Sequence, residues 1–209
     1  MRNDWEFIID SPSEASLSPD EKARVEATNA IAASLMLDAL AQFRNRVHLG
    51  KELLKTFHSL FCDGIPNTTP GQYRTKPCTV SKNHVPPKAR EIDRLIDEMF
   101  EYASRFEDHS YHVSAFLLWR IVWIHPFNDG NGRVARTFCY LSLCQSLDTH
   151  FGGRDGFASY FLQRTDEYYA ALEAADRAWL DSDQDLQQPL NLHSLEMLIA
   201  DALSSQLQS

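Results

Sequence analysis

The residues best suited to chemistry lie together in one short stretch, HPFNDGNGRVAR, at residues 125–136. Of the side chains present, histidine titrates nearest to neutral pH, so His125 is the group suited to accept a proton from a hydroxyl. Asp129 offers the oxygen ligand that Mg²⁺ prefers, and Arg133 and Arg136 offer guanidinium groups that bind phosphates. A base, a metal ligand and two cations in one stretch favour phosphoryl chemistry on a nucleotide triphosphate.

Two glycines show where a phosphate chain would meet the backbone. Gly130 and Gly132 lack a Cβ, so that the backbone N–H groups around them can approach a ligand closely. The apolar run at residues 115–124 is expected to be a buried helix, and Pro126 prevents that helix from continuing through the residue before it. A second helix is expected to begin at Asn131, and the free N–H groups and dipole of its N-terminus would attract an anion.

Each feature also has an ordinary structural explanation. A GNG sequence is usually a turn, a histidine after an apolar helix is often a satisfied structural residue, and two arginines at this spacing often form a solvated salt-bridge face. Phe127 most simply packs inward and anchors the loop. The combination of all these features within twelve residues favours the functional interpretation.

The elements that must position this stretch are predicted to be helices. SPDE begins the first one, with Ser18 as N-cap, Pro19 in the first turn and Glu21 closing a capping box. An irregular β-hairpin is expected at residues 73–87, where β-branched residues and prolines surround a turn candidate. The predicted fold is therefore all-α with one short β-hairpin. Apolar periodicity places the helices at residues 18–47, 51–62, 88–103, 112–124, 131–146, 157–180 (one helix or two) and 192–207.

Composition excludes several classes of protein. The formal net charge of −9 argues against sequence-independent binding to DNA or RNA. No apolar run is long enough to cross a bilayer, and the N-terminus lacks the apolar core of a signal peptide, so a soluble cytoplasmic protein is expected. The four cysteines show no zinc-site spacing and are expected to be free thiols.

The motif stretch resembles the signature of the Fic (Fido) family, HPFx(D/E)GNGRxxR, at every fixed position. The segment PGQYRT followed by HVPP is similar to the family's approach to its β-hairpin flap, and DEYYAAL is similar to the Tyr-rich stretch after the motif helix. The likeness covers about residues 48–182. The fixed positions are His125, Pro126, Phe127, Asp129, Gly130, Asn131, Gly132, Arg133 and Arg136.

The resemblance implies transfer of AMP from ATP to a Tyr, Thr or Ser hydroxyl of a target protein, with release of pyrophosphate. It implies that His125 is the base and that Asp129 holds Mg²⁺ between the α- and β-phosphates. The flap would hold the target by strand addition. The nucleotide-binding residues would be Asn128, Gly130, Asn131 and Gly132 near the α-phosphate and Arg133 and Arg136 at the β- and γ-phosphates.

Glu26 is a candidate regulatory residue, because many members of the resembled family carry an inhibitory helix with the pattern (S/T)xxxE(G/N). The aligned sequence here is KARVEA, in which Lys22 and Ala27 depart from the pattern and the glutamate alone remains. Glu26 either pairs with Arg136 and restrains the site or is an ordinary helical glutamate.

Other functions stay open at this point. The stretch is also compatible with a regulatory nucleotide-binding module that uses another donor (UMP or phosphocholine) or has no transferase turnover. A His–Asp metal phosphohydrolase ranks last, because the sequence has no HD dipeptide. The expected organisation is an arm at residues 1–17, a helix with a possible inhibitory role at 18–47, a Fic core at 48–182 and an amphipathic helix at 183–209. That last helix either packs on the domain or mediates a homodimer.

Overall fold

The computed structural model describes residues 17–42, 47–80, 84–151 and 154–207, and every regular element within these ranges is a helix. The predicted all-α class is confirmed, and most predicted helices agree closely with the observed ones. The predicted arm at residues 1–17 lies almost wholly outside the described residues. The helices are α1 (Pro19–Gln42), α2 (Lys51–Cys62), the short 3₁₀ helix η1 (Ala89–Glu91), α3 (Ile92–Arg105), α4 (Ser110–Ile124), α5 (Asn131–Ser146), α6 (Arg154–Gln163), α7 (Thr165–Asp181) and α8 (His193–Leu207).

The flap segment, residues 73–87, differs from the sequence expectation. Its described parts, residues 73–80 and 84–87, contain no β-strand, and the turn candidate at residues 81–83 lies outside the described residues. Its backbone bonds elsewhere: the N–H of Arg74 donates to the carbonyl of Pro126 over 2.8 Å. The prolines of the segment have no N–H to offer a ladder.

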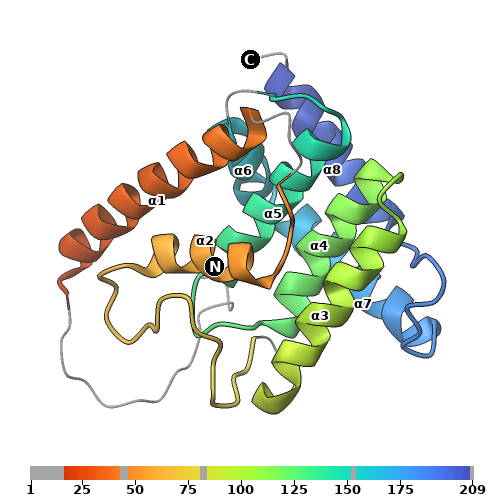
Figure 1. Cartoon of the computed structure of the whole chain (residues 1–209), viewed down its shortest axis with the longest axis horizontal. Coiled ribbons are helices and arrows are strands. Elements are labelled where there is room, and N and C mark those ends of the chain that lie inside the picture. The colour runs from red at the N-terminus through yellow and green to blue at the C-terminus, as the bar shows by residue number, and fades with distance from the viewer. Residues whose placement is uncertain (1–16, 43–46, 81–83, 152–153, 208–209) are drawn as a thin grey trace.

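Helices α4 and α5 form the centre of the molecule, with α1 and α2 on one side and α7 and α8 on the other (Figure 1). The sequence of α4 is apolar on all sides, as expected for a helix surrounded by others. The motif loop, residues 125–130, joins α4 to α5 and is held at the buried junction of these two helices. The buried residues of α4 are Val113, Ser114, Ala115, Phe116, Leu117, Leu118, Trp119, Arg120, Ile121 and Ile124.

Helix α1 begins at the predicted capping box. The N–H of Ser18 donates to Glu21 Oε2 over 2.9 Å, and the N–H of Glu21 donates to Ser18 Oγ over 3.3 Å. Further along, the buried Asn29 amide donates from Nδ2 to the carbonyls of Phe61 (3.2 Å) and Asp63 (2.7 Å). These bonds satisfy carbonyls at the C-terminal end of α2 and fasten α1 across it. The predicted extension of α1 to residue 47 covers residues 43–46, which lie outside the described residues.

Helix α2 packs against the motif loop through His58. His58 is buried, and its ring stacks on Phe127 with centroids 3.7 Å apart and planes within 4°. Its Nδ1 accepts the N–H of Gly71 over 3.0 Å, so the ring proton is on Nε2, which lies 3.2 Å from the carbonyl oxygen of Asp129 and can donate to it. Burial lowers the pKa of His58 to about 4, so the ring is neutral at physiological pH. The expected inward packing of Phe127, which is fully buried, is confirmed.

Helix α8 packs against α4, α6 and α7. Whether this helix also mediates a homodimer stays a prediction. A polar chain links it to the core: His112 Nδ1 lies 2.8 Å from Glu196 Oε1, and His112 Nε2 lies 2.8 Å from the hydroxyl of Tyr102. Among the described residues, no helix combines the length and apolar character that a bilayer span requires. The four cysteines are free thiols.

The contact between α1 and α2 gives a test of what fastens the N-terminal helix. Asn29→Ala is expected to lower the free energy of unfolding by about 1–3 kcal/mol, because it leaves two carbonyls without their donor. Thr28→Ala is the matched control, since Thr28 is exposed on the same helix, and should change it by less than about 0.5 kcal/mol. Urea denaturation measures both, and equal effects would contradict the role assigned to Asn29.

Candidate active site

His125 sits at the end of α4 in a left-handed conformation, with φ 50° and ψ 61°. Its N–H still donates to Ile121, but the chain then turns away from the helix, as the following Pro126 requires. A non-glycine residue in this region costs about 1–2 kcal/mol, which its surroundings must offset. Such strain often accompanies a functional side chain.

The imidazole of His125 is only 3% exposed. Burial lowers its pKa from 6.5 to about 4, and a hydrogen bond that the ring donates to the backbone of Val122 acts in the opposite direction. At neutral pH the ring is therefore unprotonated and can accept a proton. A substrate hydroxyl, however, reaches it only when part of its cover moves.

Arg74 holds the entrance to the motif loop. Its buried guanidinium donates from Nε to the carbonyl of His125 over 2.7 Å and from Nη2 to that of Ile124 over 3.4 Å. The same group donates to the carbonyls of Lys76 (3.0 Å) and Pro87 (2.6 Å) at the two ends of the flap segment. One side chain therefore joins the flap segment to His125.

Asn131 closes the motif loop on itself. Its Oδ1 accepts the N–H of Phe127 over 2.9 Å, and its Nδ2 donates to the carbonyl of the same residue over 2.9 Å. The sequence predicted that Asn131 binds nucleotide. The structure gives its side chain this loop-closing position, so that its share of an anion site would be the backbone N–H. Asn128 is half-buried in the same loop.

The glycines make room for the arginines. Gly130 has φ 76°, and a Cβ there would lie 3.2 Å from Cys62 Sγ and 3.7 Å from Arg133 Nη2. A Cβ on Gly132 would lie 3.3 Å from Arg136 Nη1. Both guanidinium groups therefore fold back over the first turn of α5, beside the N–H groups that the sequence analysis assigned to a phosphate.

The two arginines have different neighbours. Arg136 lies near Tyr168 and Tyr169 of α7; burial raises the pKa of Tyr168 to about 12, and the Arg136 charge opposes that rise. Arg133 lies with Nη2 3.5 Å from Asp129 Oδ2 and its guanidinium 5.8 Å from the ring centre of Phe61. Only Arg133 faces α1.

Glu26 reaches the motif, but its partner differs from the predicted one. Its Oε1 lies 3.6 Å from Arg133 Nη1, whereas the sequence resemblance assigned it to Arg136. Asn29, three residues further along α1, fixes the register of that helix over the end of α2. In this register the carboxylate meets the arginine at the start of α5, because Arg136 lies on the side of α7.

Asp129 fits the predicted role of a metal ligand by its chemistry. Its Oδ1 accepts the N–H of Gly130 over 2.5 Å, which leaves Oδ2 toward Arg133. Within the described residues, no cluster of three or more His, Cys, Asp or Glu side chains is arranged to hold a metal ion. A Mg²⁺ ion here would therefore take one protein carboxylate, with phosphate and water oxygens as its other ligands, which is a common arrangement for this ion.

Sequence reasoning missed two residues that build the site, His58 and Arg74. The first had a local signal: it shares the inward face of α2 with Leu54, Phe57 and Phe61, so a buried polar role was readable. Arg74 had no comparable signal. Its sequence context shows only a cation among turn-forming residues, with no acidic neighbour.

Comparisons with known proteins agree with this geometry. The Fic/DOC family model matches residues 48–143. Among curated proteins, the chain is 33% identical over 69 residues to the protein adenylyltransferase Fic of Nematostella vectensis, covering 32% of this chain and 16% of that protein. It is 35% identical over 83 residues to a Fido domain-containing protein of Dictyostelium discoideum, covering 40% of this chain and 53% of that protein. The matches thus span about half or less of these relatives.

Solved structures match across nearly the whole chain. A Fic family protein from Desulfovibrio desulfuricans superposes with a TM-score of 0.62 at 20% identity, covering 93% of this chain and 55% of that one. A segment of Fic-1 from C. elegans superposes with a TM-score of 0.64 at 18% identity, covering 92% of this chain and 53% of that one. At these identities the likeness establishes the fold.

Family match and fold agree on the same part of the chain. Residues 48–143 therefore match the Fic/DOC family model, and they contain the motif loop with His125 and Asp129 and the start of α5 with Arg133 and Arg136.

Proposed function

We propose that this protein is an adenylyltransferase that moves AMP from ATP to a Tyr, Thr or Ser hydroxyl of a target protein. The observation that carries the proposal is the neutral imidazole of His125 at one end of a loop whose other end carries two guanidinium groups over a helix N-terminus. The name of the Nematostella relative supports the same reaction.

In the proposed reaction, His125 accepts the proton of the target hydroxyl while the hydroxyl oxygen forms a bond to the α-phosphorus of ATP. The bond from the α-phosphorus to the bridging oxygen breaks, and pyrophosphate leaves with the electron pair. Arg133 and Arg136 would hold the β- and γ-phosphates, and the N–H groups at the start of α5 would bind the oxygens on which charge develops. Asp129 would hold Mg²⁺, which neutralises phosphate charge when bound.

The flap segment would position the target protein. Residues 73–80 have no strand partner in the described part of the chain, so a target backbone can add beside them. The segment is fixed at its base by Arg74 and by His84, whose Nε2 lies 2.8 Å from the carbonyl of Trp123. Both contacts end within two residues of His125, so the target would be held next to the base.

A second candidate is a nucleotide-binding module without turnover, or one with another donor such as UMP or phosphocholine. The burial of the His125 imidazole favours this alternative, since a hydroxyl cannot reach the ring in the described state. The covered imidazole is equally compatible with a transferase that is held inactive. Glu26, which lies 3.6 Å from Arg133, is the residue that would hold it so.

Removal of the base is the first test of the proposal. Purified protein incubated with Mg²⁺, ATP labelled at the α-phosphate and a cell lysate is expected to label protein, and His125→Ala is expected to abolish the labelling. His109→Ala is the control, since His109 is exposed at the other end of α4. Calorimetric binding of ATP without labelling by the unmodified protein would favour the second candidate.

The pH dependence of labelling tests the state of the base. The active form is the neutral imidazole, and its lowered pKa of about 4 keeps it neutral well below pH 6. The initial rate with saturating Mg²⁺ and ATP is therefore expected to change by less than about twofold between pH 8 and pH 6. A fall of about fourfold by pH 6, with a midpoint near 6.5, would instead indicate an ordinary solvated histidine.

The contact of Glu26 predicts a modest restraint. Its separation of 3.6 Å from Arg133 and its partial exposure limit the pair to about 0.2–1 kcal/mol, so Glu26→Gln should raise labelling by only about 1.4- to fivefold. Glu26→Gly should act in the same direction. Asp20→Asn is the control on the same helix, and an unchanged rate in both Glu26 variants would assign the residue an ordinary surface role.

A further inference from the structure

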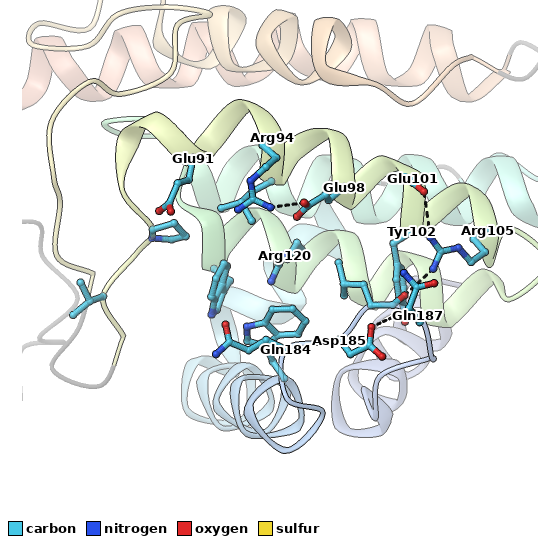
Figure 2. Close-up of a pocket in the computed structure, with 16 residues that line it drawn as sticks. Glu91, Arg94, Glu98, Glu101, Tyr102, Arg105, Arg120, Gln184, Asp185 and Gln187 are labelled. Carbon is cyan, nitrogen blue, oxygen red and sulfur yellow. Dashed lines mark hydrogen bonds and ion pairs between the residues drawn. The ribbon is translucent and has the colours of Figure 1, made fainter.

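A pocket separate from the motif loop lies beside α4, and no residue of α5 lines it. It has a volume of about 650 Å³ and is formed by α3, α4, α7, the chain after α7 and the end of the flap segment. Figure 2 shows Arg120 in the middle of this pocket, with Glu91, Arg94 and Glu98 on one side of it and Gln184 and Asp185 on the other. Its size is typical of sites for small ligands.

Arg120 is a buried cation within an otherwise apolar helix, with 1% of its surface exposed. Its guanidinium carbon lies 4.3 Å from the ring centre of Trp123, 4.5 Å from that of Trp179 and 5.4 Å from that of Trp119. It donates no hydrogen bond to any residue that the structure describes, and its buried Nε and Nη1 atoms are without an acceptor there. The three aromatic rings around this cation come from two helices, α4 and α7, and could not be predicted from the apolar run alone.

The other charged groups around the pocket already have partners. Arg94 pairs with Glu98, and Arg105 Nη1 donates to the carbonyl of Leu186 over 2.8 Å while its Nη2 lies 3.3 Å from a carboxylate oxygen of Glu101. The remaining two carboxylates accept backbone N–H groups: Glu91 accepts that of Lys88 over 3.1 Å, and Asp185 accepts that of Gln187 over 2.8 Å. Among the charged side chains that line the pocket, Arg120 is the one without a hydrogen-bond or ion-pair partner in the described residues.

This exception has an energetic consequence. Burial lowers the pKa of Arg120 to about 10, which still leaves it charged at neutral pH. The aromatic faces attract the cation but accept none of its N–H groups, and an unpaired buried charge is costly. An acceptor that enters the pocket would therefore gain a charge-assisted hydrogen bond without breaking an existing pair.

We propose that this pocket binds a carboxylate group through Arg120, with the rings of Trp123 and Trp179 in contact with the apolar part of the ligand. A guanidinium has its donors in one plane, and the planar carboxylate matches them, whereas the aromatic rings occupy space beside that plane. A single negative charge also suits the surroundings. The lining holds three arginines and four carboxylates, so a phosphate dianion would meet about twice the net repulsion that a carboxylate monoanion meets.

The proposal does not depend on nucleotide transfer, because none of the pocket residues belongs to the motif loop. Two sources of the carboxylate are possible: a free small acid, or an acidic side chain of a bound peptide. The pocket reaches Val85 and Pro87 of the flap segment, so a peptide lying along the flap could extend an acidic residue into it.

Intrinsic fluorescence gives a direct measurement, because three of the four tryptophans of the chain surround the guanidinium. Benzoate is expected to change the emission of the full chain saturably, while benzamide, its uncharged counterpart, should not. Arg120→Met should raise the half-saturating concentration by at least about tenfold. Arg105→Met, which removes a paired arginine at the rim, should change it by less than about twofold.

Two arms separate the sources. A blocked peptide with one central glutamate, compared with its glutamine counterpart, should bind more tightly than benzoate if the natural ligand is an acidic peptide, and more weakly if it is a free acid. Inorganic phosphate should compete poorly in either case.

Arg120→Met is expected to fold, because methionine replaces an unpaired buried charge with an apolar chain of similar length. If it does not fold, the unmodified protein decides: benzoate should shift the indole N–H resonances of Trp123 and Trp179 in an NMR titration. Absence of those shifts, equal responses to benzoate and benzamide, or binding that Arg120→Met leaves intact would each overturn the proposal and make Arg120 a purely structural cation.

Discussion

The motif loop is buried, so its backbone N–H and C=O groups must find partners inside the protein. Water cannot supply them between α4 and α5, and the loop is too irregular to satisfy itself by helical bonds. Three side chains do so. Asn131, directly after the loop, bonds Phe127; from distant parts of the chain, Arg74 bonds the carbonyls of Ile124 and His125, and His58 approaches that of Asp129. The site exists because these few polar contacts fix an otherwise costly conformation.

That constraint explains why structural and chemical groups alternate along the loop. Phe127 points inward onto His58, while Asp129 and Arg133 face the opposite way, toward Glu26 of α1. The left-handed His125 is the point where the chain changes direction, and Arg74 holds its carbonyl. The guanidinium of Arg74 also binds both ends of the flap segment, so the position of that segment and the orientation of His125 are mechanically linked.

The helices and the motif could be predicted from the sequence because their signals are local. Periodicity placed α2 and α5 at their observed bounds, and the SPDE capping box placed the start of α1. The misses depend on contacts between distant segments. The flap segment formed no strand in its described parts because Arg74 and the prolines direct its backbone elsewhere, and Glu26 met Arg133 because Asn29 sets the register of α1. Contacts of this kind can be predicted only when the relative positions of the helices are known.

The energies of these contacts show which of them controls the N-terminal helix. The pair of Glu26 with Arg133 is long and partly exposed, so it contributes less than about 1 kcal/mol. The two hydrogen bonds of Asn29 are buried or partly buried, and losing them together costs about 1–3 kcal/mol because their acceptors are left unmet. Asn29 therefore holds α1 in place, and Glu26 occupies the space beside Arg133 as a result. A ligand with several phosphate charges can outcompete the carboxylate for the arginine without displacing the helix, because the two interactions are separable.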